Sequence, residues 1–291
     1  MPPSAPRAVT RRAALRGAAA AGVVTLSGCG PKGAATTFET ARETGAIKVG
    51  FANEAPYGFI DKTGRLTGEA PEVARAVLRP YGIVRLEGVL ADFRQLISGL
   101  QAEQYAFVAA GMFMNPERCA DADFSIPDYR VESAFLVPAG NPAGITRFTD
   151  IRGTDVLIAV LTGGVELGYA VEAGVPEEQI VTLGDQDSLF RAVRAGRVYG
   201  AAMPDITVAY LLAQHPGSGL EKTASFRRGG TADVGGFTFP EGASGFISAF
   251  NTGLRRLKRS GEWLRIVQPF GFSQRNAPPP GMTTEQFCGD A

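Results

Sequence analysis

Short apolar segments alternate with amphipathic segments along the first half of the chain. The apolar segments have the length and composition of strands, and they are residues 47–52, 84–90 and 105–112. Between them lie two segments with apolar residues at helical spacing, residues 70–82 and 93–102. In the first of these, Val73 and Val77 share one face and Gly82 ends the helix. The order strand, helix, strand, helix, strand predicts an open α/β lobe.

The same order returns later in the chain. Strands are predicted at residues 156–161, 179–184 and 198–203, and helices at residues 162–174, 187–196 and 205–217. Residues 135–144 and 235–242 are rich in Gly and Pro beside apolar residues, and we predict that they cross between two lobes. Residues 247–272 have a helical pattern, so this segment should pack back on the first lobe, with Trp263 as a packing anchor.

The pattern therefore predicts an α/β protein with two open lobes joined by a two-strand hinge. We assign residues 45–138 and 238–291 to lobe 1 and residues 139–237 to lobe 2. Ligands of such sheets bind beyond the carboxyl ends of the strands, so the residues that follow each strand are the candidates for a binding site.

Residues 1–28 have the pattern of a processing signal rather than of a folded segment. Four arginines and no acid occur there, and a short apolar run ends in Leu-Ser-Gly before Cys29. This pattern resembles a lipoprotein signal peptide, in which the cysteine is lipidated, and the pair Arg11-Arg12 also allows twin-arginine export. Residues 29–44 would then be a tether. A transmembrane anchor or a disordered tail is the alternative, although the apolar run is short for a membrane span.

The composition is that of an ordinary globular protein. The chain has 291 residues, 45% of them hydrophobic and 20% charged, and its formal net charge is zero. This balance argues against a nucleic-acid partner. The sequence indicates neither a metal site nor a cofactor, since it contains no CxxC and no GxxxxGK motif. Outside the cytoplasm, Cys119 and Cys288 should form a disulfide that ties the C-terminal tail to lobe 1; two separate buried thiols are the alternative.

The stretch GFANEAPYGF, residues 50–59, places an acid among aromatic rings directly after the first predicted strand. Pro56 interrupts the stretch, so we predict a loop. Rings and charges also follow the other two strands of lobe 1. The candidates at this edge of the sheet are Glu54, Tyr57, Phe93, Phe113 and Arg118.

In lobe 2, the first strand ends in Thr162-Gly163-Gly164 and the third is followed by Asp205, each at the start of a predicted helix. Backbone N–H groups at a helix start suit an anion such as a carboxylate, and Arg118 can hold the same carboxylate with two hydrogen bonds. Aromatic faces attract a cation by about 0.5–2 kcal/mol each, and Glu54 or Asp205 can neutralise it. The predicted ligand is a small zwitterion whose positive part is flat or alkylated.

Each candidate also has an interpretation that involves no ligand. These are Phe93 and Phe113 as core residues, Arg118 as the partner of Asp121, Asp205 as a helix N-cap, residues 162–164 as a tight turn, and Glu54 as a solvated loop acid. The joint placement of the candidates after successive strands is what favours a binding site.

The two-lobe order and the run AAMPDITVAYLL resemble the extracytoplasmic solute-binding proteins, family 3, which serve ABC importers of amino acids and related polar solutes. Within that family, the segments VGFANEAPYGF, LTGEAPEVARAVL, GMFMNPERC and AVLTGGVELGYA are similar to the ectoine/hydroxyectoine-binding proteins. The resemblance covers roughly residues 45–275 and implies a type II periplasmic-binding-protein-like fold.

The resemblance also implies roles for the candidates. These are Glu54 for the protonated ring nitrogens of ectoine, Tyr57, Phe93 and Phe113 for a cation–π cage, Arg118 for the carboxylate with help from the Thr162 region, and Asp205 as a cap or a ligand contact. A tyrosine is more usual at the position of Phe93, whose ring offers no hydrogen bond. The acid then lies among rings because the ligand is a cyclic cation.

The sequence thus predicts a non-enzymatic, lipid-anchored extracytoplasmic protein that delivers ectoine or hydroxyectoine to the transmembrane subunits of an ABC permease. One alternative keeps the binding function and changes the ligand to an ordinary amino acid, proline betaine or glycine betaine. A betaine has no N–H group that could donate a hydrogen bond to Glu54. The other alternative is an enzyme on the same fold, such as a dehydratase, with Glu54 and Asp205 as catalytic carboxylates. The lone histidine, His215, lies in a predicted turn.

Overall fold

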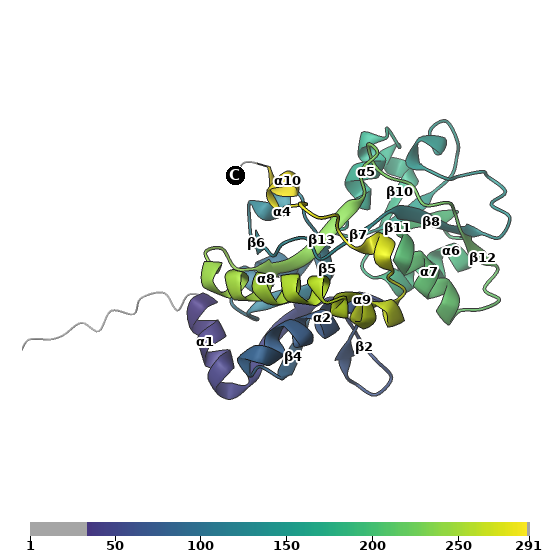
Figure 1. Ribbon diagram of the computed structural model, residues 1–291. Helices are drawn as coiled ribbons and strands as arrows, with labels where there is room; N and C mark the ends of the chain where they lie inside the picture. The colour runs from purple at the N-terminus through teal and green to yellow at the C-terminus, as the bar shows by residue number, and fades with distance from the viewer. Residues whose placement is uncertain (1–33, 290–291) are drawn as a thin grey trace, which may run out of the picture. The chain divides into compact units, whose positions relative to one another are not determined.

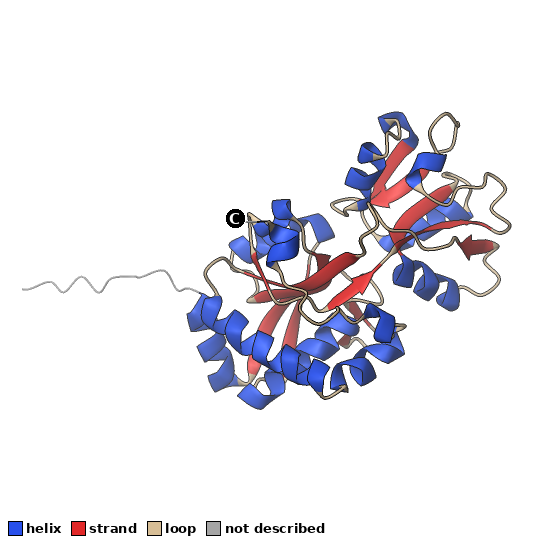
Figure 2. Ribbon diagram, turned by 45° about the horizontal axis from the view of Figure 1, so that its top comes forward, coloured by secondary structure: helices blue, strands red, loops and turns tan. Residues whose placement is uncertain are grey.

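The computed structural model describes residues 34–289, which form two separate groups of strands, each flanked by helices (Figure 2). The first sheet has the order β4-β1-β5-β13-β6, with β7 paired to β13, and the second has the order β10-β9-β11-β8-β12. In both sheets three parallel strands are continued by antiparallel ones. The predicted α/β class with two lobes is confirmed.

The strands of the first sheet are β1 (Ala46–Phe51), β4 (Arg85–Leu90), β5 (Phe107–Phe113), β6 (Asp123–Phe124), β7 (Tyr129–Val131) and β13 (Asp233–Phe239). Those of the second are β8 (Ser133–Pro138), β9 (Ile158–Leu161), β10 (Ile180–Leu183), β11 (Gly200–Pro204) and β12 (Leu220–Lys222). A small hairpin is made by β2 (Phe59–Ile60) and β3 (Leu66–Thr67). All but one of the residues of β5 are buried, as expected for a central strand covered on both faces.

The helices are α1 (Ala34–Thr44), α2 (Glu69–Leu78), α3 (Leu96–Gln101), α4 (Pro116–Cys119), α5 (Glu166–Glu172), α6 (Gln186–Arg194), α7 (Asp205–Gln214), α8 (Ser244–Arg259), α9 (Glu262–Val267) and α10 (Glu285–Cys288). Their amphipathic patterns explain which faces are buried. In α6, for example, Leu189, Phe190 and Val193 face the core of lobe 2, and Asp185 caps the helix by accepting a hydrogen bond from the Ser188 N–H.

The core of lobe 1 is aromatic and depends on the C-terminal helices. The Phe107 ring from β5 packs against Phe239 from β13 and against Phe246 and Phe250 from α8. Figure 1 shows α8 lying along lobe 1 beside α2, which it contacts. Trp263 in α9 is buried, and its Nε1 donates a hydrogen bond to Asp128 Oδ1 over 2.7 Å. The segment 247–272 therefore packs on lobe 1 with Trp263 as an anchor, as predicted.

The crossings between the sheets differ from the predicted boundaries. Strand β8, which we assigned to lobe 1, pairs with β11 in the second sheet, so the chain crosses at Glu132. Most of the return strand β13 was assigned to lobe 2, but β13 pairs with β5, β6 and β7 in the first sheet. Both strands are apolar and buried, and hydrophobicity alone does not say which of two sheets an apolar strand joins.

Part of the predicted tether is helical. Residues 34–44 form α1, where Phe38 is buried and its ring stacks on Phe246 of α8 with centroids 4.5 Å apart. The predicted signal peptide, residues 1–28, and the lipidation residue Cys29 lie outside the described residues. In the described part of the chain, no helix has both the length and the apolarity that a membrane span requires.

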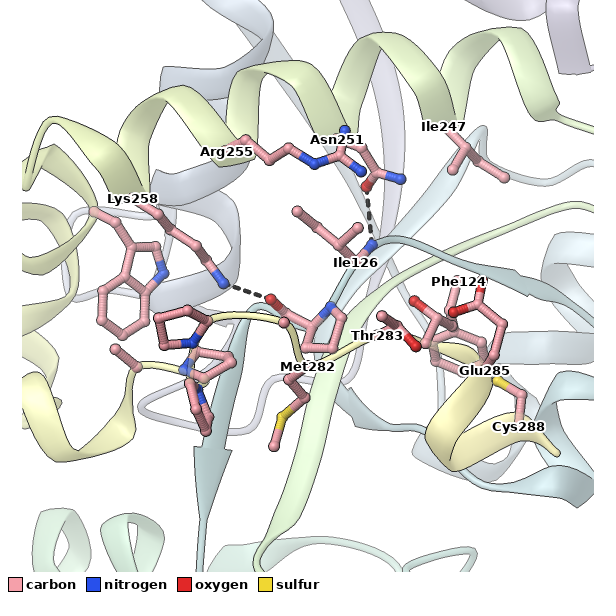
Figure 3. A pocket seen from close by; sticks show the side chains of 18 of the residues that line it. Phe124, Ile126, Ile247, Asn251, Arg255, Lys258, Met282, Thr283, Glu285 and Cys288 are labelled. Carbon is pink, nitrogen blue, oxygen red and sulfur yellow. Dashed lines mark hydrogen bonds between the residues drawn. The ribbon is translucent and has the colours of Figure 1, made fainter.

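The C-terminal tail returns to lobe 1, where a disulfide joins Cys119 of α4 to Cys288 of α10. Figure 1 shows these two helices side by side. Between this tail and α8 lies a groove of about 1220 Å³ (Figure 3). In the groove Lys258 donates hydrogen bonds to the carbonyls of Pro127 and Asp128, and the Ile126 N–H donates to Asn251 Oδ1.

Candidate functional site

A cavity of about 40 Å³ is lined by residues from both lobes, at the carboxyl ends of the parallel strands. Lobe 1 contributes Glu54, Tyr57, Phe93, Gly111, Phe113 and Arg118. Lobe 2 contributes Leu161, Gly164, Val165, Glu166, Gln186, Leu189, Ala202, Met203, Pro204 and Thr207. All five candidates predicted from lobe 1 therefore reach one cavity. Of the four predicted from lobe 2, only Gly164 lines it.

The loop after β1 presents Glu54 to the cavity. The loop is tight, because the Tyr57 N–H donates to the Glu54 carbonyl and the Glu54 N–H donates to the Gly58 carbonyl. Glu54 is only partly accessible and lines the cavity, so it is not a freely solvated loop acid. The same turn directs Tyr57 inward, where its ring lies 5.2 Å from the ring of Tyr129.

The three rings are both cavity walls and core residues. Tyr57, Phe93 and Phe113 are at least nine-tenths buried. Tyr57 fits only because Gly111 has no side chain: a Cβ there would lie 2.3 Å from Tyr57 Cδ1, and Gly111 has a φ of 68°. The Tyr57 hydroxyl is buried and makes no hydrogen bond with any described residue. The core interpretation and the binding interpretation of these rings are therefore compatible.

Arg118 reaches across from lobe 1 to lobe 2. Its side chain donates to the Phe113 carbonyl over 2.9 Å and to the Gly163 carbonyl over 2.8 Å. The guanidinium lies 5.4 Å from the centre of the Phe93 ring, a cation–π distance. Within residues 34–289 it forms no ion pair with Asp121, so the alternative partner is not used. The remaining guanidinium N–H groups are left for a ligand.

The glycine turn of lobe 2 brings the two lobes close together. Gly163 has a φ of 82°, and a Cβ on it would lie 2.6 Å from Arg94 Cβ of lobe 1. Thr162 and Gly163 are not among the residues that line the cavity. Gly163 instead contributes its carbonyl to Arg118, and Gly164 contributes a wall.

Asp205 lies at the crossing between the lobes rather than at the cavity. Its Oδ2 accepts a hydrogen bond from Ser225 Oγ over 3.0 Å, and its backbone N–H donates to the Glu132 carbonyl. Asp205 opens α7, but its side chain caps no N–H group of that helix. Neither predicted role of Asp205, as ligand contact or as N-cap, matches this placement. The residue fastens two segments that pass between the lobes.

Sequence analysis missed Glu166 and Gln186. Glu166 is 4% exposed and lines the cavity from α5, and Gln186 lines it from the first residue of α6. Both occupy the first turn of a helix, where polar residues are common for reasons unrelated to ligands. The sequence therefore carries no signal that separates these two residues from ordinary helix starts.

Burial and nearby negative charges raise the pKa of both acids that line the cavity. Burial, helped by the negative charges of Glu166 and Asp185, raises the pKa of Glu54 to about 8, although Arg118 acts in the opposite direction. Burial raises the pKa of Glu166 to about 7, with a contribution from Asp233. The cavity thus holds two carboxyl groups against one guanidinium. Among residues 34–289, no group of three or more His, Cys, Asp or Glu side chains could hold a metal ion.

Known proteins with similar sequences and structures include solute-binding proteins of ABC transporters. A probable amino-acid ABC transporter periplasmic-binding protein of Sinorhizobium fredii is 29% identical over 265 residues, which cover 88% of this chain and 87% of the relative. The crystal structure of EhuB in complex with hydroxyectoine is similar with a TM-score of 0.80 and 30% identity, covering 88% of this chain and 99% of EhuB.

A third relative bears on the question of catalysis. An ancestral amino-acid-binding protein, a precursor of cyclohexadienyl dehydratase, is similar with a TM-score of 0.71 and 25% identity over 80% of this chain and 99% of the ancestral one. The sequence model of the bacterial extracellular solute-binding proteins, family 3, matches residues 47–273. The chain therefore belongs to this family, whose extracytoplasmic members bind small solutes for ABC importers.

Proposed function

We propose that this solute-binding protein captures ectoine or hydroxyectoine and delivers it to the permease subunits of an ABC importer. The observation that carries the proposal is the convergence of Glu54, three rings and Arg118 on one cavity. The likeness to EhuB with bound hydroxyectoine supports the same ligand class.

The chemistry of ectoine matches the lobe 1 wall of the cavity. Its amidinium ring is flat and cationic, so it can lie between aromatic faces, and each ring contact should contribute about 0.5–2 kcal/mol. The ring N–H groups can donate to Glu54. The carboxylate of the ligand can accept from the Arg118 guanidinium, whose position is fixed by the Phe113 and Gly163 carbonyls.

Binding would draw the lobes together around the solute. Arg118 already joins lobe 1 to the glycine turn of lobe 2, so a ligand carboxylate at this guanidinium would contact both lobes at once. A closed, water-excluding cavity strengthens each charged hydrogen bond, which favours tight binding of a small solute. The closed form is the one that a permease can distinguish from the open form.

Calorimetric titration of the purified protein tests the ligand. Ectoine and hydroxyectoine should bind, while glycine betaine, proline and glutamate should bind at least about 10-fold more weakly, because none of them supplies a flat cationic ring with N–H donors. If glutamate or proline bound more tightly than ectoine, the ligand would be an ordinary amino acid instead. The names of two relatives, both probable amino-acid ABC transporter binding proteins, support that alternative.

The likeness to a dehydratase precursor also favours a test for catalysis. Incubation with candidate solutes followed by mass spectrometry should return each solute unchanged. Formation of a product would mean that the protein is an enzyme.

Lipid anchoring at Cys29 belongs to the same proposal, and replacement of Cys29 by Ala should release the protein from the membrane fraction of the producing cells.

A further inference from the structure

The cavity receives one carboxyl group from each lobe. Glu54 comes from the loop after β1, and Glu166 comes from α5 of the opposite lobe. The Glu166 side chain folds back over the glycine turn, since a Cβ on Gly164 would lie 2.7 Å from Glu166 Oε2. This orientation brings the second acid to the part of lobe 2 that faces lobe 1.

The cavity lining contains buried polar atoms without partners among the described residues. Gln186 is 7% exposed, and its Oε1 has no partner among the described residues, nor has the Tyr57 hydroxyl. Arg118 is the one cationic side chain among the lining residues, and two of its N–H groups are taken by backbone carbonyls. Buried polar atoms are rarely left unsatisfied, so a solute with N–H or O–H groups would fit the Gln186 acceptor.

The charges of the two cavity acids also favour a solute that carries a positive group. The negative charges of Glu166 and Asp185 and the positive charge of Arg118 act on Glu54, and those of Asp233 and Arg118 act on Glu166. Asp233 in turn accepts a hydrogen bond from the Tyr169 hydroxyl of α5. Where both acids are ionised, closure of the lobes is opposed by their repulsion at low dielectric, which Arg118 offsets only in part and a positive group between the acids would relieve. A neutral or anionic solute would leave that repulsion in place whenever both acids are ionised.

We propose that Glu166 and Glu54 form a two-carboxylate subsite across the lobes, which selects a cationic solute with N–H donors on two sides and uses that cation to hold the lobes closed. This inference rests on the proposed function, because ectoine meets the requirement. Its amidinium carries one N–H on each of two ring nitrogens, on either side of one carbon atom. One N–H donates to each carboxylate. Glycine betaine has no N–H and cannot bridge the pair.

The test compares Glu166→Gln with Glu178→Gln. The first keeps the size of the side chain and removes its charge, and the second makes the same change at an exposed residue of lobe 2 outside the cavity. Glu166→Gln should bind ectoine about 10-fold more weakly, the difference between a charged and a neutral hydrogen bond, while Glu178→Gln should bind like the unmodified protein. Affinity for glycine betaine should fall less than affinity for ectoine in Glu166→Gln, because betaine carries a positive charge but has no N–H to donate, and it should not change in Glu178→Gln. Equal ectoine affinity in all three proteins overturns the inference and leaves the proposed function standing.

A second measurement needs no ligand. Without solute, Glu166→Gln should melt at a higher temperature than the unmodified protein at about pH 8.5, where both acids are mostly ionised. The difference should shrink as the pH falls and be lost by about pH 4, below the ordinary pKa of 4.5 that Glu166 has in the unfolded chain. The absence of any difference at high pH overturns the inference.

If the unmodified protein does not bind ectoine, the proposed function fails, and the affinity comparison is repeated with arginine, which carries N–H groups on two cationic ends. Unchanged arginine affinity in Glu166→Gln then overturns the inference, and weaker binding supports it. If arginine does not bind either, the melting comparison decides.

Discussion

The two walls of the cavity differ in chemistry. The lobe 1 wall carries three aromatic rings, an acid and the guanidinium of Arg118, whereas the lobe 2 wall is mostly aliphatic and carries Glu166 and Gln186. Lobe 1 therefore has the groups that grip a flat cation and a carboxylate. Lobe 2 has the second acid and the Gln186 Oε1, which has no partner among the described residues.

This difference assigns recognition of the solute to lobe 1 and closure around it to lobe 2. The lobe 1 wall is built on strand ends and fixed by packing, as the contact of Tyr57 with Gly111 and Tyr129 shows. The contribution of lobe 2 depends on how near it lies to lobe 1, because Gly163 meets Arg94 and the Arg118 guanidinium at the seam. We therefore expect changes in lobe 1 to remove binding and changes in lobe 2 to alter selectivity.

The largest effect is expected from Arg118→Ala, which removes the main cation of the lobe 1 wall. Ectoine binding should weaken by about 2–5 kcal/mol, since the ligand carboxylate would be buried without its partner. Calorimetry measures this, with Arg118→Lys as the control that keeps the charge and loses the planar geometry. If Arg118→Ala bound ectoine with an affinity within about twofold of the unmodified protein, Arg118 would not bind the ligand carboxylate. The role assigned to lobe 1 would then be wrong.

Reduction of the disulfide should affect the stability of lobe 1 without affecting recognition. The bond between Cys119 and Cys288 joins residues 169 positions apart, so its loss should lower the free energy of unfolding by about 2–5 kcal/mol. Thermal melting with and without a reductant measures the change, and the double variant Cys119→Ser/Cys288→Ser controls for other effects of the reductant. An equal melting temperature in both conditions would contradict a stabilising role for the bond.

Raising the pH should change stability and affinity in opposite directions. The pKa of Glu54 is about 8 and that of Glu166 about 7, both above the ordinary value of 4.5, so the folded protein keeps protons that the unfolded chain has released. Stability without ligand should therefore fall as the pH rises through these values. Affinity for a cation should rise, by at most about tenfold per pH unit for each acid that must ionise. Melting and calorimetry at several pH values measure the two trends, and parallel trends would contradict the assignment.

The smallest expected effect is that of Phe113→Leu. The ring lines the cavity and also lies 6.2 Å from Tyr129 in the core. Ectoine binding should weaken by about 1–2 kcal/mol through the lost cation–π contact, and the free energy of unfolding should fall by less than about 1.5 kcal/mol. Phe250→Leu is the control, since this ring is fully buried in the core and does not line the cavity. A larger loss of stability than of affinity in Phe113→Leu would make the ring a core residue alone.

The site shows where sequence analysis reached its limit. Glu54, Tyr57, Phe93, Phe113 and Arg118 were predicted because each follows a strand of one parallel sheet, and the ends of such strands meet at one edge. Asp205 follows a strand in the same way but lies at the crossing, where Ser225 and Glu132 hold it. Glu166 and Gln186 lie in the first turns of helices, and nothing in their neighbours distinguishes them.

The sequence by itself determined the local elements, the two α/β lobes and the residues at the strand ends, because hydrophobic period and turn residues act over a few positions along the chain. Only the tertiary structure decided which sheet β8 and β13 join and how closely the glycine turn of lobe 2 approaches Arg118. It also decided that two acids share one cavity. Those properties depend on contacts between segments far apart in the chain, and the pattern around one residue does not record its distant neighbours.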